Sequence, residues 1–267
     1  MSTVHAIAPR HPQRETLVCL HSSGSSGRQF DTLAAALQSR FKVIAPDLLG
    51  YGDRRRWPSG TPASLDDEAQ AIAPLLNIAP VHLFGHSYGG AVALQIALRW
   101  PERVRSLTLY EPVRFALLFR DARTEAAGES IVAVGRRIGL EVLSGAVHAA
   151  AQRFVDYWSG PGTWPRLGTE RQQAIAERMS KVQAEFEALF ADRVPAAAYG
   201  RLTMPVHLIG GSRSPLPARQ VLEVLEAALP NVRRTTLAGL GHIGPIEAPQ
   251  RVLDTMGEAE AGLAQAA

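Results

Sequence analysis

The sequence predicts an α/β protein built on a mostly parallel central sheet. Two observations carry this prediction: short apolar runs alternate with segments of helical periodicity, and the apolar runs are continuous along their length. Continuous apolar runs are typical of parallel strands that are covered on both faces. Strands that alternate with helices indicate a sheet flanked by helices. The chain has 267 residues, 46% of them hydrophobic and 20% charged, which suits one large domain or one domain with an insertion.

The expected strands and helices can be placed in order along the chain. Strands are expected at residues 16–21, 41–48, 81–87, 104–111 and 205–211, and a weaker one at 232–239. Helices fit at residues 28–39, 63–77, 88–99 and 246–263. Ser64, followed three residues later by Asp67, is a capping signal for the second of these helices. Residues 3–9 could form a further strand, and at most one strand is expected before residue 16.

The alternation stops between residues 112 and 204, where the pattern is helical. Helices are expected at 129–143, 146–158 and 169–191, the last because its apolar residues recur close to the helical period. We therefore expect a core formed by residues 1–112 and 204–267, with a helical insertion at 113–203. Trp158 and Trp164 are candidates to line a substrate pocket, although aromatic residues in such an insertion more often form its own core.

Composition and charge argue against several classes of function. The net charge is +3, but the 28 basic residues include only two lysines and the arginines are scattered, which is not a nucleic-acid-binding pattern. Cys19 is the only cysteine, so no intrachain disulfide can form. No apolar run approaches the ~18 residues that span a bilayer, and the first residues do not resemble a signal peptide. We expect a cytoplasmic protein that could form a homodimer and that binds a small molecule and neither nucleic acid nor membrane.

A candidate nucleophile lies in the stretch FGHSYGG, residues 84–90, which contains the pattern G-x-S-x-G around Ser87. An expected strand runs directly into this stretch and an expected helix runs directly out of it. A serine on so sharp a turn has a strained backbone and an exposed hydroxyl. The start of the helix supplies unpaired N–H groups and a positive dipole end, which favour a developing anion. The alternative is an ordinary strand–turn–helix with an incidental serine.

At this point the chain resembles the α/β-hydrolases, and the resemblance covers nearly its whole length. Four motifs carry it, in the order and spacing of the family: LHSSGSSGRQF (20–30), APDLLGYGDR (45–54), GHSYGG (85–90) and GHIGPIEAP (241–249). The resemblance implies an α/β-hydrolase fold in which Ser87 is the nucleophile at the elbow, and it places the helical insertion where the family has its cap. We find no metal-binding cluster or phosphate-binding glycine loop in the sequence, and we therefore expect no cofactor.

The resemblance also implies the groups that assist Ser87. A serine hydroxyl needs a base, and the loop at 241–249 resembles the one that carries the catalytic histidine, here His242. The oxyanion formed from an ester needs two N–H donors, which the resemblance places on the backbone of Ser23 and Tyr88. Ser22 stands where the family usually has glycine, and this is a departure of the loop from the family pattern.

The acid of the catalytic triad is the position where this chain departs from the family. The family usually has an aspartate just after the strand expected at 205–211, but Ser214 stands there and the neighbouring residues include no acid. Some members, notably one group of haloalkane dehalogenases, carry the acid after the preceding strand. In this chain that position is Glu111, and the order Ser87, Glu111, His242 keeps the order of the family. The alternative is that Glu111 is a structural residue paired with Arg114 and that His242 works without a carboxylate.

Three functions follow from these residues. The leading one is a serine hydrolase that cleaves a small carboxylic ester, lactone or similar acyl compound through an acyl-enzyme on Ser87. The same triad would also support carbon–carbon bond hydrolysis of a small diketone-like acid. A non-catalytic binding protein is a third possibility, favoured only by the missing aspartate. Dehalogenases and epoxide hydrolases of this fold use an aspartate nucleophile, and the serine at position 87 argues against both.

Overall fold

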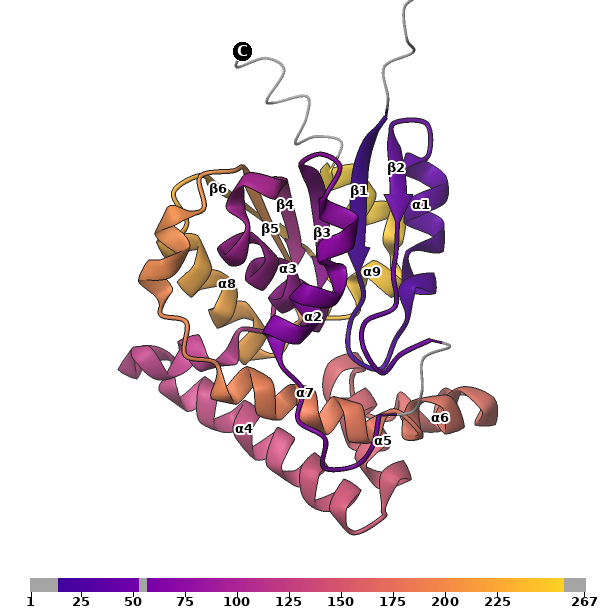
Figure 1. Cartoon of the computed structure of the whole chain (residues 1–267). Helices are drawn as coiled ribbons and strands as arrows, with labels where there is room; N and C mark the ends of the chain where they lie inside the picture. The colour runs from indigo at the N-terminus through magenta and orange to yellow at the C-terminus, as the bar shows by residue number, and fades with distance from the viewer. Residues whose placement is uncertain (1–13, 53–56, 257–267) are drawn as a thin grey trace, which may run out of the picture.

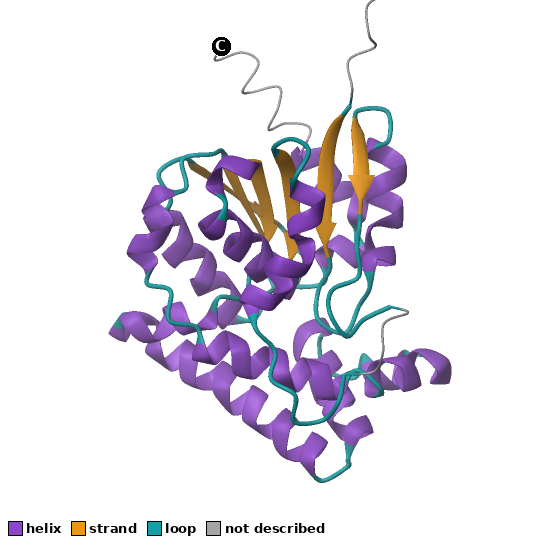
Figure 2. Ribbon diagram, in the orientation of Figure 1, coloured by secondary structure: helices purple, strands orange, loops and turns teal. Residues whose placement is uncertain are grey.

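The computed structural model describes residues 14–52 and 57–256 and contains, in these ranges, one six-stranded parallel sheet. The strand order is β2-β1-β3-β4-β5-β6. Helices lie on both faces of the sheet (Figures 1 and 2), which confirms the predicted fold class. The strands are β1 (Glu15–Leu20), β2 (Phe41–Ile44), β3 (Val81–His86), β4 (Val104–Tyr110), β5 (Val206–Gly211) and β6 (Val232–Leu237).

The strand order places a crevice at the ends of β1 and β3. The chain leaves β1 for β2 on one side, whereas β3 lies on the other side of β1. In open α/β sheets, ligands bind outside the carboxyl ends of the strands at such a switch point. The register pairs His86 with Tyr110 at the ends of β3 and β4. The next residues, Ser87 and Glu111, therefore emerge side by side at this edge of the sheet.

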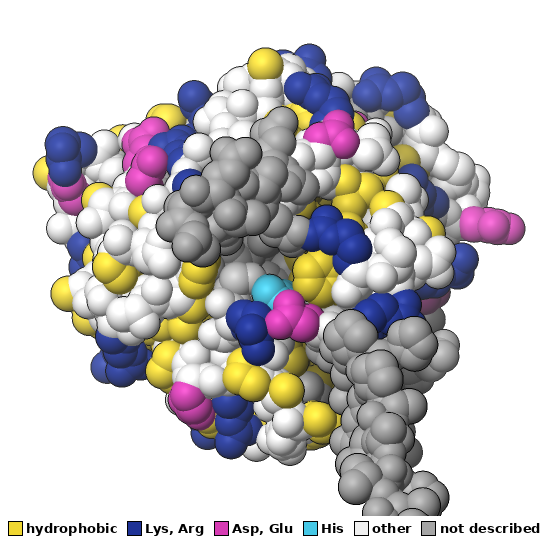
Figure 3. Space-filling view, turned by 90° about the horizontal axis from the view of Figure 1, so that it is seen from above, with side chains coloured by type: hydrophobic (Ala, Val, Ile, Leu, Met, Phe, Trp, Pro, Cys, Tyr) yellow, Lys and Arg dark blue, Asp and Glu magenta, His cyan; other side chains and the backbone are white. Residues whose placement is uncertain are grey.

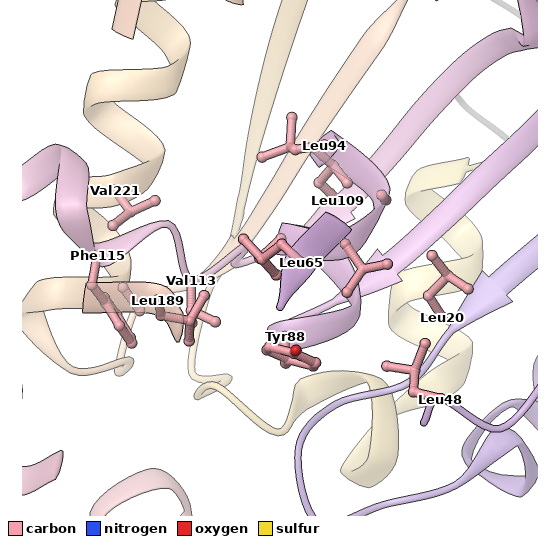
Figure 4. Packing of buried hydrophobic residues seen from close by; sticks show 14 of the residues in the cluster. Leu20, Leu48, Leu65, Tyr88, Leu94, Leu109, Val113, Phe115, Leu189 and Val221 are labelled. Carbon is pink, nitrogen blue, oxygen red and sulfur yellow. The ribbon is translucent and has the colours of Figure 1, made fainter. Parts of the chain in front are cut away.

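Two hydrophobic clusters fill the two sides of the sheet. One joins the sheet to α2 (Leu65–Ile72), α3 (Tyr88–Arg99) and α8 (Leu216–Ala228) and includes the residues labelled in Figure 4. The other joins the sheet to α1 (Asp31–Leu37) and to helical residues 249–256. α3 has ten buried residues among its twelve, which fixes the helix behind Ser87 in the middle of the core.

A helical segment connects β4 to β5 and lies along the C-terminal ends of the strands (Figure 1). Its helices are α4 (Ala122–Leu143), α5 (Val147–Ser159), α6 (Thr169–Ala176) and α7 (Met179–Ala191). A buried ion pair attaches it to the core: Lys181 Nζ on α7 lies 2.7 Å from Glu68 Oε1 on α2, and both side chains are 1% exposed. Arg114 and Asp192 form a second buried pair at 2.8 Å, near the two ends of the segment.

Several elements differ from the sequence-based expectations. The helix expected at 169–191 is two helices, because the chain turns at residues 177–178. The helix expected at 246–263 breaks at Ala248, since the residue before Pro249 is disfavoured in the helical conformation. The strand expected at 41–48 ends at Ile44, just before Pro46. α8 was not predicted, although Ala218, Val221, Leu222 and Leu225 form a buried stripe along it.

Other expectations hold or fall outside the described residues. Ser64 caps α2 as predicted, because its side chain accepts hydrogen bonds from the N–H groups of Asp66 and Asp67. The strand considered at 3–9 and the end of the last expected helix lie outside the described ranges. Within those ranges, no helix combines the length and apolarity needed to cross a membrane. On the face at the N-terminal ends of the strands, Lys and Arg side chains are scattered and several lie beside Asp or Glu (Figure 3).

Candidate active site

Ser87 lies on a sharp turn between β3 and α3. Its backbone has φ 55° and ψ −118°, in the left-handed half of conformational space that non-glycine residues rarely adopt. The turn leaves no room for side chains at its glycines: a Cβ on Gly89 would lie 2.1 Å from the carbonyl oxygen of Leu20, and one on Gly85 would lie 2.6 Å from Cα of Gly90. Ser87 N–H donates to the carbonyl of Tyr110 at 3.0 Å, which fixes the turn to the neighbouring strand.

His242 connects Ser87 with Glu111. Its Nε2 lies 2.9 Å from Ser87 Oγ, and its Nδ1 lies 2.6 Å from Glu111 Oε2. The three side chains come from the ends of β3 and β4 and from the loop after β6, and all three residues are buried, with exposed fractions of 5%, 0% and 3% for Ser87, Glu111 and His242. The structure thus brings together the predicted nucleophile, acid and base in one line of hydrogen bonds.

Glu111 is held in place by donors on its other oxygen. Oε1 accepts hydrogen bonds from Gly211 N–H at 2.6 Å and from Ser214 Oγ–H at 2.5 Å. Two donors at Oε1 suit an ionised carboxylate, which only accepts hydrogen bonds, and Oε2 of such a carboxylate accepts from a proton on His242 Nδ1. Ser214, the residue at the usual aspartate position, therefore contacts the acid rather than the histidine. Arg114, considered as an alternative partner for Glu111, is paired with Asp192 instead.

Glu111 also has an unusual backbone. Its φ is 46°, which makes it, with Ser87, one of two non-glycine residues with positive φ among those described. Its N–H donates to the carbonyl of Ile209 on β5 at 3.0 Å. Backbone strain of this kind costs roughly 1–3 kcal/mol and tends to occur where geometry matters for function. The two strained residues are the ones that face each other across His242.

The two predicted oxyanion donors lie on either side of the crevice. Ser23 follows β1 and lines the cavity beside Ser87, and Tyr88 is the first residue of α3. Within the described part of the chain, neither backbone N–H donates a hydrogen bond. The loop that carries Ser23 is tied down nearby, because Gly24 N–H donates to the Tyr51 hydroxyl at 3.0 Å.

Sequence reasoning missed a buried chain of hydrogen bonds that links this loop to the histidine loop. Ser22 donates to Gln29 Oε1 through both its N–H (3.2 Å) and its hydroxyl (2.9 Å). Gln29 Nε2 lies 2.9 Å from His86 Nδ1, and His86 Nε2 lies 2.8 Å from the carbonyl of His242. His86 therefore points away from the nucleophile and holds the backbone of the base. No local signal marks Gln29, because the chain of hydrogen bonds joins three separate segments, those of Ser22 and Gln29, His86 and His242.

A cavity of about 480 Å³ opens at Ser87 and His242, between the core and the helical segment. Trp158 on α5 lines it, and its ring lies 4.0 Å from the ring of His242, centroid to centroid. Trp164, the other candidate, is not among the residues that line this cavity. It begins a short 3₁₀ turn, its N–H donates to Asp156 Oδ1, and its ring packs against that of His148.

Comparison with known proteins agrees with this geometry. The family model described as alpha/beta hydrolase fold matches residues 15–249. The chain belongs to the α/β hydrolase family. This confirms the family predicted from the sequence, and it supports the predicted class of enzyme, a hydrolase.

Curated relatives of this α/β hydrolase include esterases and lipases. It is 37% identical to Lipase LipV of Mycobacterium tuberculosis over 112 residues, which cover only 41% of either chain. It is 29% identical to the pimeloyl-[acyl-carrier protein] methyl ester esterase of Neisseria meningitidis serogroup B over 225 residues, 84% of each chain.

Solved structures show the same fold. The 2-hydroxy-6-oxo-6-phenylhexa-2,4-dienoate hydrolase of Rhodococcus superposes with a TM-score of 0.71 at 21% identity, covering 93% of this chain and 91% of that one. The thermophilic esterase of Thermogutta terrifontis gives a TM-score of 0.70 at 21% identity, with the same coverage. At this level of identity, the likeness concerns the fold.

Burial keeps several histidines of this α/β hydrolase neutral, two of them (His21 and His86) beside the site and one (His207) near the N-terminal end of β5. Burial, with a contribution from the neighbouring His242, lowers the pKa of His86 to about 3. Burial also lowers the pKa of His21 to about 4 and that of His207 to about 3. A neutral His86 can accept from Gln29 and donate to the His242 carbonyl, as the hydrogen-bond chain requires. Among the described residues, no cluster of His, Cys, Asp or Glu is placed to hold a metal ion.

The lowered pKa values of these histidines predict how the stability of the protein depends on pH. Unfolded histidines titrate near 6.5, so below that pH the unfolded chain binds protons that the folded His21, His86 and His207 do not. Each such proton lowers the free energy of unfolding by up to about 1.4 kcal/mol per pH unit. Glu185 acts in the opposite direction, since burial raises its pKa to about 7 and its folded form gains a proton as the pH falls from 7 to 4.5. We expect a net loss of stability between pH 6.5 and 5.

Urea unfolding at pH 7.5, 6.0 and 5.0 measures this loss. The variant Glu185→Gln removes the carboxylate that takes up a proton in the folded state and so offsets the effect of the histidines. Its stability should therefore fall more steeply over the same pH range. A free energy of unfolding that stays constant or rises toward pH 5 would show that the buried histidines do not control stability in this range.

Proposed function

We propose that this protein is a serine hydrolase that cleaves small carboxylic esters, lactones or related acyl compounds through an acyl-enzyme on Ser87. The observation that carries the proposal is the position of His242, which contacts Ser87 Oγ at 2.9 Å and Glu111 Oε2 at 2.6 Å. This is the arrangement that nucleophilic acyl transfer requires: a hydroxyl, a base within hydrogen-bond reach, and a carboxylate that orients the base.

The reaction follows from the donors and acceptors in the site. His242 Nε2 takes the proton of Ser87 Oγ as the oxygen attacks the carbonyl carbon of the substrate. The carbonyl oxygen becomes negative and accepts hydrogen bonds from the free N–H groups of Ser23 and Tyr88. The tetrahedral intermediate collapses, and the alcohol leaves with the proton from His242. A water molecule then gives its proton to His242, attacks the acyl-enzyme and releases the acid, with the proton returning to Ser87.

The carboxylate at position 111 supports both proton transfers. It stabilises the imidazolium that forms at His242 and keeps Nδ1 protonated, so that Nε2 faces the serine. We further propose that residues 113–203 act as a cap that supplies one wall of the cavity and sets substrate size. The contacts of Trp158 with His242 and of Lys181 with Glu68 support this role, because they hold α5 and α7 against the core.

Pre-steady-state hydrolysis of p-nitrophenyl butyrate tests the proposal. An acyl-enzyme predicts a rapid release of about one equivalent of p-nitrophenol per protein when deacylation is slower than acylation. Mass spectrometry of the quenched protein should then show a butyryl adduct. Digestion should locate this adduct on the peptide that contains Ser87. A protein that only binds ligands would neither release p-nitrophenol above the background rate nor carry the adduct, and that result would refute the proposal.

A further inference from the structure

The walls of the cavity differ in character. α5 and the histidine loop contribute apolar side chains, among them Phe154, Trp158 and Ile243. Polar and charged side chains come from the serine-rich loop 22–26 and from two arginines of the helical segment, Arg171 on α6 and Arg178 before α7. One carboxylate, that of the exposed Glu247, also lines the cavity. The lining therefore carries more positive than negative charge.

The two arginines differ from others in the helical segment in their partners. Arg153 is paired with Glu141 at 2.6 Å and Arg114 with Asp192 at 2.8 Å. Arg178 Nη1 instead donates to the backbone carbonyls of Gly24 (2.9 Å) and Ser25 (3.3 Å), which are neutral acceptors. Among the described residues, no carboxylate lies within ion-pair distance of Arg178 or Arg171, and nothing accepts from Nε or Nη2 of Arg178. Among the described residues, Glu247 is thus the carboxylate that shares the cavity with these two arginines, of which Arg178 is half-buried and Arg171 is exposed.

The contacts of Arg178 also fix where this charge lies. Gly24 and Ser25 directly follow Ser23, one of the two proposed oxyanion donors, so the guanidinium sits on the wall of the cavity formed by that loop. The apolar wall around Trp158 lies against His242. A substrate held at Ser87 thus meets apolar side chains in one direction and, in another, two guanidinium groups that form no ion pair with a described carboxylate.

We propose that the cavity takes esters that carry a second, anionic group, a carboxylate or a phosphate, and that Arg178 and Arg171 bind this group. The inference rests on the proposed hydrolase function and names its substrate class. Guanidinium groups pair with carboxylates and phosphates through charge-assisted, often bidentate hydrogen bonds. In a partly enclosed cavity these bonds discriminate strongly against an analogue that lacks the anion, because the cations would then stay unpaired.

A matched set of esters tests the proposal. Methyl hexanoate and monomethyl adipate differ only in a terminal methyl group against a carboxylate, and methyl 5-phosphonooxypentanoate offers a phosphate. We expect kcat/KM to be at least about tenfold higher for one of the anionic esters than for methyl hexanoate. The anionic ester with the higher kcat/KM, the carboxylate or the phosphate, shows which anion the site binds. The preference should collapse in Arg178→Gln and Arg171→Gln, but persist in Arg136→Gln, which removes an exposed arginine of α4 that does not line the cavity.

The outcomes separate this inference from the proposed function. Hydrolysis of all the esters without an anion preference would overturn the inference and leave the hydrolase intact. The inactive variant Ser87→Ala gives a second readout, since calorimetry should show binding of monomethyl adipate that is weakened at least tenfold by Arg178→Gln. If wild type hydrolyses none of the esters but this arginine-dependent binding is present, the hydrolase proposal fails and the anion site stands. If binding does not depend on either arginine, the anion site is refuted.

Discussion

Replacing Ser87 by alanine is expected to lower kcat for p-nitrophenyl butyrate by at least ~10⁴-fold, because it removes the attacking atom, the hydroxyl that is hydrogen-bonded to His242 Nε2. Loss of the catalytic serine costs roughly 10⁶-fold in kcat in the serine protease subtilisin. Alanine keeps the β-carbon and the strained turn, so the melting temperature should change by only a few degrees.

The control for this variant is Ser130→Ala, which removes an exposed serine whose hydroxyl bonds only to the carbonyl of Ala127 on α4. Its activity should equal that of wild type. Retention of more than a tenth of the wild-type rate by Ser87→Ala would mean that another group attacks the substrate, and the proposed mechanism would be wrong.

Replacing Glu111 by glutamine is expected to lower kcat at least ~10²-fold, with folding largely intact. Every partner of this carboxylate is a donor: Gly211 N–H and Ser214 Oγ–H at one oxygen and His242 Nδ1–H at the other. A glutamine must turn its NH₂ group toward one of these donors, so it disrupts either its own anchoring or the tautomer of His242. It also removes the negative charge that offsets the imidazolium, an effect worth up to ~10⁴-fold in a protease triad.

Ser214→Ala is the matched comparison for Glu111→Gln. It removes one of the donors to Glu111 Oε1 but leaves Gly211 N–H and the contact with His242, so we expect a loss of no more than about tenfold, the cost of one hydrogen bond. Both variants should be assayed on the same ester, with the melting temperature as the folding control. If Glu111→Gln stays near wild type while Ser214→Ala collapses, Glu111 is not the triad acid.

The sequence predicted the parts of the site that follow from strand ends. Ser87 and Glu111 each come directly after an apolar run, and parallel strands deliver their C-terminal residues to one edge of the sheet. The family motif around His242 placed the base there as well. The position of the acid was the least conventional of these predictions, and the structure brings Glu111 within 2.6 Å of His242.

Other features depend on contacts that a local pattern does not encode. Gln29 and His86 connect three segments that meet only in the folded protein. Trp164 is a large aromatic residue of the kind that often lines a pocket, but its ring packs against that of His148 on α5. The chain turn at residues 177–178 interrupts a pattern with continuous helical periodicity, and it is this turn that presents Arg178 to the cavity.

Labelling with a fluorophosphonate is the measurement that tests the central claim most directly. These reagents react with a serine hydroxyl that is activated by a neighbouring base and mimic the tetrahedral intermediate. The proposed arrangement predicts one adduct per chain on Ser87, abolished in Ser87→Ala and slowed at least ~10²-fold in Glu111→Gln, in proportion to its loss of activity. A wild-type protein that is folded, yet remains unlabelled at Ser87, would contradict the assignment of Ser87, His242 and Glu111 as a catalytic triad.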